Sequence, residues 1–211
     1  MKRRVPALLA ASALALGAVQ ATAPAAGAQA VGEDSLAALL TSDGDTFDKD
    51  KKDFDIVTEA ALAIVAAKPD SPVALLADGT QKLTVFAPTD EAFRLLAKDL
   101  TGQTIKSEKK IFEALVELAG VDTIETVLLY HVVPGKTLTS AKVLKADGAS
   151  LATAQGGKIK VKVKMKPVSV TLKDRDRDAE DPQAVLKALD LNKGNKQVAH
   201  GIDRVLRPID L

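Results

Sequence analysis

The sequence offers few side chains for nucleophilic or metal chemistry. Its 211 residues include no cysteine and two histidines, His131 and His200. Without cysteine the chain can form no disulfide, no thiolate nucleophile, no cysteine-ligated zinc site and no iron–sulfur cluster. With one tyrosine and no tryptophan, it also lacks the aromatic platforms on which single-stranded nucleic acid stacks. We therefore expect no cofactor and no nucleic-acid partner.

The clearest charged pattern is a run of alternating lysines at residues 158–166. The intervening positions are apolar: Ile159, Val161, Val163 and Met165. A period of two predicts a half-buried strand with its lysines in water. Lys160, Lys162 and Lys164 could then contact an anionic polymer. The simpler alternative, which the near-neutral charge of the chain favours, is a solvated strand face or a sheet edge that lysines and Pro167 protect from aggregation.

Two aspartate runs raise the question of calcium. Asp174, Asp176 and Asp178 match the first three ligand positions of an EF-hand loop. However, Ala179 stands where that loop needs glycine, and Val185 stands where it needs glutamate. The earlier run fits no ligand register either; it comprises Asp43, Asp45, Asp48, Asp50 and Asp53. We predict solvated loops for both runs, and no metal site.

Catalytic motifs are equally sparse. Residues 148–152, with the sequence GASLA, come close to the G-x-S-x-G nucleophile elbow but lack its last glycine. An elbow also needs a strand before the turn and a helix after it, whereas here the order is reversed. The sequence holds no phosphate-binding loop, dinucleotide fingerprint or H-E-x-x-H motif. We therefore predict no catalytic residues and a protein that is not an enzyme.

Tyr130 and His131 follow the apolar run 126–129. A histidine at the end of an apolar helix is expected to be buried, with its ring nitrogens bonded to backbone groups. A ligand or contact role for the pair is the alternative. His200, in the predicted last strand, receives the same interpretation.

Residues 1–30 have the pattern of a secretory signal peptide. Lys2, Arg3 and Arg4 precede an apolar stretch at 7–19, and small residues follow. That stretch is shorter than the roughly 20 residues of a membrane span, so we expect export without a membrane anchor. Cleavage after Ala28 or Ala30 would leave 26 basic and 28 acidic residues, a net charge of −2. We predict that residues 31–211 form a single domain, secreted and monomeric.

The periodicity changes along this domain from helical to extended. Helices are predicted at 35–40, 54–68, 90–98, 107–120, 123–131, 139–146 and 183–189. Strands are predicted at 82–87, 149–154, 158–166, 168–172 and 197–206. Residues 173–182 are a charged loop. Helices that come first and strands that come later predict an α+β fold.

Three blocks of sequence, in order, resemble the signatures of fasciclin domains. They are Thr84–Phe93 (TVFAPTDEAF), Leu128–Gly135 (LLYHVVPG) and Gln197–Pro208 (QVAHGIDRVLRP). Residues 54–56 resemble the family's opening helix. The resemblance implies a β-sandwich or wedge with packed helices, and an extracellular module for adhesion at a cell surface or matrix. It also implies a weak link of Tyr130 and His131 to receptor binding.

We therefore expect a non-enzymatic interaction module whose partner is a protein or polysaccharide at the cell surface or matrix. One alternative is an envelope protein that carries a ligand or has a structural role, and a carrier would show a sizeable apolar pocket. A secreted hydrolase is the other alternative.

Overall fold

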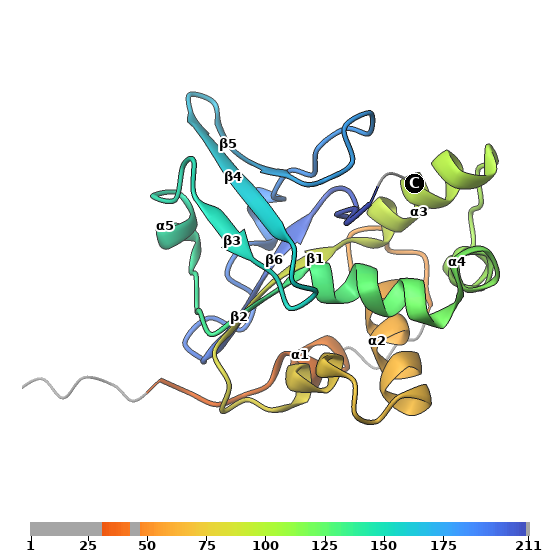
Figure 1. The fold of residues 1–211 in the computed structure, drawn as a ribbon, viewed down its shortest axis with the longest axis horizontal. Helices are drawn as coiled ribbons and strands as arrows, with labels where there is room; N and C mark the ends of the chain where they lie inside the picture. Colours follow the sequence, from red (N-terminus) through yellow and green to blue (C-terminus); the bar gives the residue numbers. More distant parts are fainter. Residues whose placement is uncertain (1–30, 43–46, 210–211) are drawn as a thin grey trace, which may run out of the picture. The chain divides into compact units, whose positions relative to one another are not determined.

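The computed structural model describes residues 31–42 and 47–209 (Figure 1). The predicted signal peptide, Asp43 and Asp45 lie outside the described residues. Residues Val31–Leu211 form one compact unit. No helix within the described ranges combines the length and apolarity needed to cross a bilayer.

Helices dominate the first half of this unit. The α-helices there are α1 (Leu36–Leu40), α2 (Asp55–Ala67), α3 (Asp90–Thr101) and α4 (Glu108–Tyr130), with a 3₁₀ helix η1 (Pro72–Ala77). Three of these helices have a hydroxyl N-cap: Ser35 in α1, Thr89 in α3 and Ser107 in α4. Each hydroxyl oxygen accepts a hydrogen bond from a backbone N–H group in the first turn of its helix. The helices predicted at 35–40, 90–98 and 107–120 begin at or next to these caps, because an N-cap depends on the local sequence. On the outer face of α2, Leu62 is 47% exposed.

A kink at Gly120 divides α4. Gly120 has φ 71° and ψ 163°, a conformation that is essentially restricted to glycine. The predicted end of one helix and start of the next are therefore confirmed. Asp122 and Glu125, at the start of the second segment, both bind the ammonium group of Lys68.

Two three-stranded sheets form the rest of the fold. In the first, the order is β2 (Val132–Pro134), β1 (Leu83–Pro88), β6 (Gln197–Ile202). β1 runs antiparallel to β2 and parallel to β6. Sequence periodicity missed β2. It also predicted β6 four residues too long, since the strand ends at Ile202 and the chain turns at Asp203, whose N–H donates to the carbonyl of Gln183.

The second sheet has the order β3 (Ser150–Ala152), β4 (Lys158–Met165), β5 (Val168–Lys173), all antiparallel. A short helix, α5 (Ser140–Val143), precedes it. The helix predicted at 183–189 is wrong except for a single 3₁₀ turn, η2 (Leu186–Ala188). Gln183 and Ala184 are extended instead and form bridges to Thr171 and Ile202.

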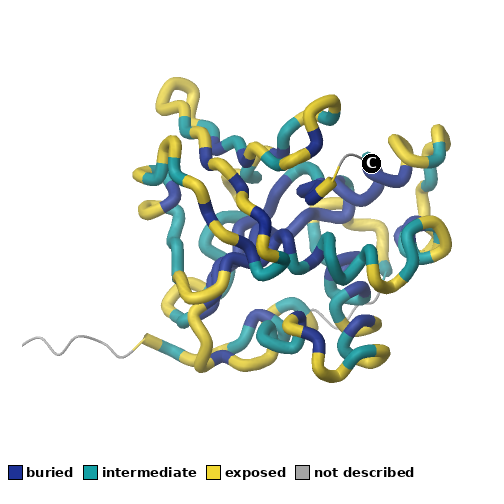
Figure 2. The backbone as a smooth tube through the Cα atoms, viewed as in Figure 1, coloured by how far each residue is buried: buried dark blue, intermediate teal, exposed yellow. Residues whose placement is uncertain are grey.

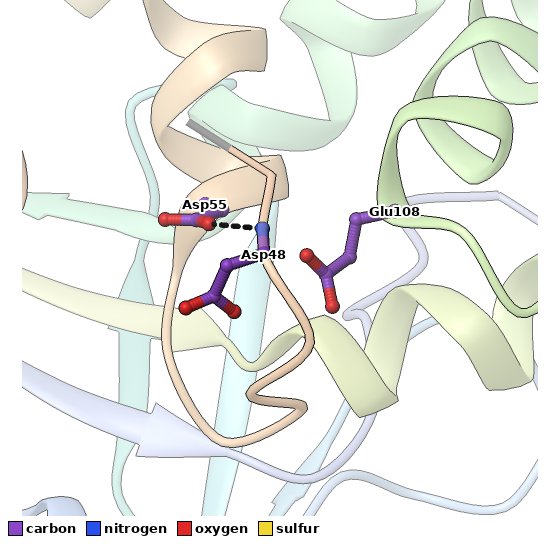
Figure 3. Close-up of side chains that lie close together, drawn as sticks. All are labelled: Asp48, Asp55 and Glu108. Carbon is purple, nitrogen blue, oxygen red and sulfur yellow. Dashed lines mark hydrogen bonds between the residues drawn. The ribbon is translucent and has the colours of Figure 1, made fainter. Parts of the chain in front are cut away.

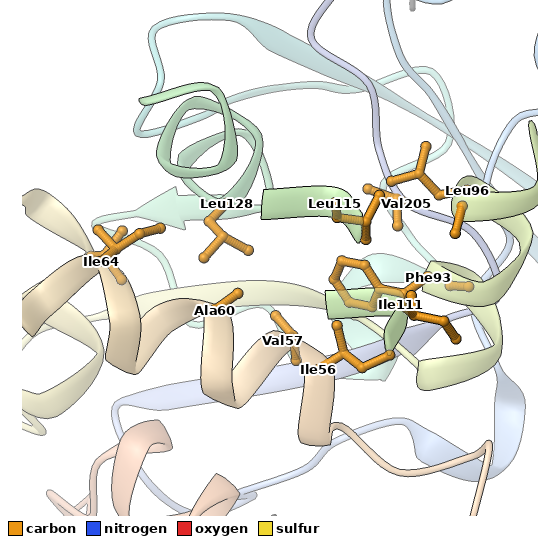
Figure 4. Packing of buried hydrophobic residues seen from close by; sticks show 13 residues of the cluster. Ile56, Val57, Ala60, Ile64, Phe93, Leu96, Ile111, Leu115, Leu128 and Val205 are labelled. Carbon is orange, nitrogen blue, oxygen red and sulfur yellow. The ribbon is translucent and has the colours of Figure 1, made fainter. Parts of the chain in front are cut away.

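The core has a helical part and a part between the sheets. In the helical part, Ile56 and Ile64 of α2 belong to one buried cluster with Phe93 of α3 and Leu115 of α4 (Figure 4). Between the sheets, Phe86 of β1 packs with residues of β4, β5 and β6, namely Ile159, Val161, Val170, Leu172 and Ile202. The tube in Figure 2 is buried along β1 and β6, and alternates between buried and exposed along β4. The fold is α+β, as predicted.

Candidate functional site

The outer face of the second sheet carries a row of lysines. Lys158, Lys160, Lys162 and Lys164 are exposed, whereas Ile159 and Val161 between them are 0% exposed. We call these four lysines the lysine face. Their cross-strand neighbours on β5 are small or polar, with Lys162 opposite Thr171 and Lys164 opposite Ser169. Hydrophobic burial on one side of β4 therefore fixes all four ammonium groups on the other side.

The lysine face has no acidic partner within the described part of the chain. None of its ammonium groups lies within 4.0 Å of a carboxylate there. The adjacent Lys173, which lies opposite Lys160, is paired with Asp181 at 2.7 Å. At about 3.4 Å per residue, the four lysines extend over roughly 20 Å of strand. The result is a linear, uncompensated cationic strip.

The pairing of β4 changes along its length. β4 pairs with β3 over residues 158–160 and with β5 over residues 160–165. Beyond Lys160, the backbone N–H groups of Val161 and Val163 donate to Ala149 O and Asp147 Oδ1, both at 2.9 Å. Edge protection and a solvated strand face therefore both stay predictions for these lysines. The predicted burial pattern fails at the end of the strand, since Met165 is 62% exposed. Beyond Val163 the hairpin extends past the core that covers Ile159 and Val161.

Tyr130 and His131 are both buried, with 0% and 1% of their surface exposed. The hydroxyl of Tyr130 donates to Lys158 O at 2.8 Å. His131 Nδ1 lies 2.7 Å from Val127 O, and Nε2 accepts from the N–H of Leu206 at 2.9 Å. Nδ1 therefore carries the proton, and burial lowers the pKa of His131 to about 4. The pair joins α4 to the C-terminal segment and to β4, so we assign it a structural role.

His200 is held in the same way. Its Nε2 lies 2.6 Å from Leu138 O, and its Nδ1 accepts from the N–H of Asp190 at 3.2 Å. Burial lowers the pKa of His200, so both histidines are neutral at pH 7. The sequence interpretation of ring nitrogens bonded to backbone groups is confirmed for both.

The loop with Asp174 and Asp176 is tied to Arg207 and is not a solvated loop. Asp174 Oδ2 accepts from the backbone N–H of Arg207 at 2.8 Å. The guanidinium of Arg207 donates to Asp176 Oδ2 at 3.2 Å and to Asp99 Oδ2 at 2.6 Å. Burial raises the pKa of Asp174 to about 6. Burial also acts to raise the pKa of Asp176, but hydrogen bonds from Ala179 N–H and Arg207 lower it overall.

Sequence reasoning missed a second group of carboxylates. Figure 3 shows Asp48, Asp55 and Glu108 directed toward one another. Their carboxylate oxygens, one from each residue, lie within 4.8 Å of one another, and a second such group contains Asp53, Asp55 and Asp90. Burial raises the pKa of Glu108 to about 7, and burial, followed by a side-chain hydrogen bond with Asp53, raises the pKa of Asp90 to about 9.

The sequence contained part of the signal for this group. Asp55, Asp90 and Glu108 are the first residues of α2, α3 and α4, where acidic side chains are favoured by the helix dipole. Asp55 and Glu108 are about 50 residues apart in the sequence. Only tertiary packing brings the three helix ends together, so the sequence pattern did not predict this group.

Cavities in the described residues include a polar pocket of about 310 Å³ beside Arg204 and Arg207. An open groove of about 710 Å³ is lined by lysines and backbone turns, with Lys82, Lys136, Lys142 and Lys196 among its residues. Lys196 in this groove is paired with Glu33 at 2.6 Å. Two apolar cavities between the helices are much smaller, about 70 and 120 Å³. These two volumes fall short of the roughly 300–1,000 Å³ of typical ligand pockets.

The chain is similar to a curated protein, to a solved structure and to a family model. A curated relative, Protein sll1483 of Synechocystis sp., is 36% identical over 95 residues, which cover 45% of each chain. The chain therefore matches less than half the length of that relative. A solved structure of a FAS1 domain pair from the insect cell adhesion molecule Fasciclin I is similar, with a TM-score of 0.44 and 16% identity; the similarity covers 70% of this chain and 44% of the insect chain. The family model of the fasciclin domain matches residues 60–208, and the chain therefore belongs to the fasciclin domain family.

Proposed function

We propose that this protein is a secreted, non-enzymatic interaction module that binds an anionic polysaccharide of a cell surface or matrix through the lysine face. Fasciclin domains are interaction modules and are typically extracellular. The pattern of residues 1–30 supports export. The observation that carries the choice of partner is the uncompensated row of four lysines on β4.

The electrostatics of this row favour a polyanion. Successive lysines lie about 7 Å apart along a strand, so their ammonium groups repel one another weakly in water. A linear polyanion that follows the strand would relieve this repulsion at several positions at once. The exported chain is near neutral overall, so attraction would be local to the face and sensitive to salt.

The end of the β4–β5 hairpin adds an apolar element beside the lysine face. Met165 and Val168 pair across the strands and are 62% and 40% exposed. An apolar tip next to a cationic strip suits recognition of a polymer with both charged and apolar surface, because contact would also remove these side chains from water.

The structure lends little support to the alternatives. The apolar cavities described above are too small for a ligand carrier, and Ser150, the serine of the near-elbow sequence, is an exposed residue at the start of a strand. A nucleophile elbow needs a sharp turn between a strand and a helix.

The test is retention on an acidic polysaccharide. Wild-type protein is expected to bind immobilised polygalacturonate at low ionic strength and to elute as salt rises, because added ions screen an exposed interface. The triple variant Lys160→Gln, Lys162→Gln, Lys164→Gln is expected to flow through. Neutral dextran should retain neither protein.

A matched control keeps the change in net charge constant. The triple variant Lys106→Gln, Lys109→Gln, Lys110→Gln removes three exposed lysines around the start of α4, away from β4. It should be retained nearly as well as wild type. If both triple variants lose retention equally, overall charge governs binding and the lysine face is not the site. If wild type is not retained at all, the proposed partner class is wrong.

A further inference from the structure

The carboxylates missed by sequence reasoning form a compact group at the point where three helices begin. We call Asp48, Asp53, Asp55, Asp90 and Glu108 the acidic cluster. Asp55, Asp90 and Glu108 open α2, α3 and α4, and the loop before α2 supplies Asp48 and Asp53. Asp55 belongs to both groups of closely spaced oxygens, so the two groups are adjacent.

Several oxygens of this cluster are buried without hydrogen-bond partners. Glu108 is 1% exposed, and neither of its carboxylate oxygens accepts a hydrogen bond from the described residues. Asp90 is 0% exposed; its Oδ1 accepts from the N–H of Ile56 at 3.0 Å, but its Oδ2 has no partner there. Asp53 Oδ1 also lacks a donor among the described residues, although the side chains of Asp53 and Asp90 are close enough to share a proton. Buried polar groups are nearly always paired in native proteins, so these oxygens point to a missing partner.

Arg94 does not fill that role. Its Nη2 lies 3.8 Å from Glu108 Oε1, which is too long for a hydrogen bond. Its Nη1 donates to the carbonyls of Ile105 and Lys106, and its Nε donates to Glu91. The guanidinium is therefore oriented mainly by groups outside the cluster.

The three helix dipoles account for the presence of acidic residues but not for their unpaired oxygens. Each helix N-terminus carries about half a positive charge, which favours a carboxylate at its first turn. The orphaned oxygens of Asp53, Asp90 and Glu108, however, bond to none of the described N–H groups. A cation that binds several carboxylate oxygens at once would serve as their partner.

We propose that the acidic cluster binds a calcium ion. The donors are all carboxylate oxygens, which suit hard cations, and the cluster contains no imidazole or thiolate of the kind that zinc and copper prefer. Calcium accepts six to eight oxygens in flexible geometry, with monodentate or bidentate carboxylates. Magnesium demands near-octahedral geometry and keeps much of its water, which fits the three buried carboxylates of this cluster, Asp55, Asp90 and Glu108, less well.

Such an ion would connect the loop before α2 to the starts of all three core helices. Asp48 is already linked to Asp55 through its N–H at 3.2 Å, and Asp90 to the start of α2 through Ile56. Calcium would bind carboxylates from the starts of α2, α3 and α4 and so offset the repulsion between their negative charges. This proposal is independent of the function proposed for the lysine face.

The direct test is a calcium titration of the purified protein after treatment with EDTA and dialysis. Isothermal titration calorimetry should show one calcium ion per chain, with Kd at or below the range of about 10⁻⁴–10⁻³ M found for extracellular modules. The thermal midpoint should rise with calcium concentration, because the ligand binds only the folded state. Magnesium should bind at least tenfold more weakly. No binding and no thermal shift at about 10 mM calcium, above the weakest of those sites, would overturn the proposal, as would equal affinity for magnesium.

Variants locate the ion. Glu108→Gln and Asp90→Asn each keep side-chain shape but remove a carboxylate, so each should weaken calcium binding at least tenfold. The calcium-free variants should be no less thermostable than calcium-free wild type, since each replaces a carboxyl group whose charged form burial disfavours. Glu113→Gln, on the exposed side of α4, should bind as wild type does. Wild-type affinity in both cluster variants would place the ion elsewhere and contradict the assignment; if the variants do not fold, the wild-type titration remains decisive.

Discussion

Replacing Arg207 by alanine is expected to lower the free energy of unfolding by about 3–5 kcal/mol, the range found when one partner of a buried ion pair is removed. The side chain of Asp176 is 1% exposed, and Arg207 is the cation that pairs with it in the described structure. The substitution would leave that carboxylate buried without compensation. It would also release Asp99, which Arg207 holds at 2.6 Å. Urea denaturation, followed by circular dichroism, measures the change.

Arg204 provides the control for this prediction. It pairs with Glu180, whose side chain is 65% exposed, and exposed pairs contribute about 0–1 kcal/mol. Arg204→Ala should therefore cost much less than Arg207→Ala. Equal losses in the two variants would show that the loop at 174–178 is not anchored through a buried ion pair.

Acidification should destabilise the protein through His131. Burial lowers the pKa of His131 to about 4, whereas the unfolded chain titrates near 6.5. Between about pH 4 and pH 6.5, the imidazole is protonated in the unfolded state but neutral in the native state. The contribution of His131 to the free energy of unfolding is therefore complete above about pH 6.5 and is lost as the pH falls. At 1.36 kcal/mol per pKa unit, the loss from pH 7 to about pH 4 is about 3 kcal/mol.

The comparison that isolates this effect is His131→Gln. Glutamine can donate to Val127 O and accept from Leu206 N–H, as His131 does, but it does not titrate. Denaturation of both proteins at several pH values should show a shallower acid dependence in the variant. Carboxylates contribute equally to both curves, so parallel curves would mean that His131 is not the group that titrates.

Local chemistry predicted much of the fold. The helix starts at Ser35, Thr89 and Ser107 and the break at Gly120 were predictable, because a cap or a glycine acts on its own neighbours. The buried side of β4 was predictable at Ile159 and Val161 because alternation reports a half-buried strand. The failure at Met165 has a tertiary cause, since the hairpin extends beyond the core.

Features that depend on contacts between residues far apart in the sequence could not be predicted. β2 has three residues and exists because β1, about fifty residues earlier, pairs with it. The same holds for the candidate sites. The lysine face was visible as a pattern, but the pairing of its strand with β3 and β5 was not. The acidic cluster was invisible because tertiary packing brings its three helix-end members to the loop that holds the other two. The charged loop at 174–178 hid a buried ion pair with Arg207.

The central claim is that the lysine face binds an anionic polysaccharide, and NMR mapping tests it most directly. Titration of ¹⁵N-labelled protein with a polygalacturonate oligomer should shift the amide signals of residues 158–165 and 168–173 most strongly, and added salt should reverse the shifts. The alternative cationic surface is the groove with Lys82, Lys136 and Lys142. Shifts confined to that groove, or no salt-sensitive shifts on β4 and β5, would contradict the account.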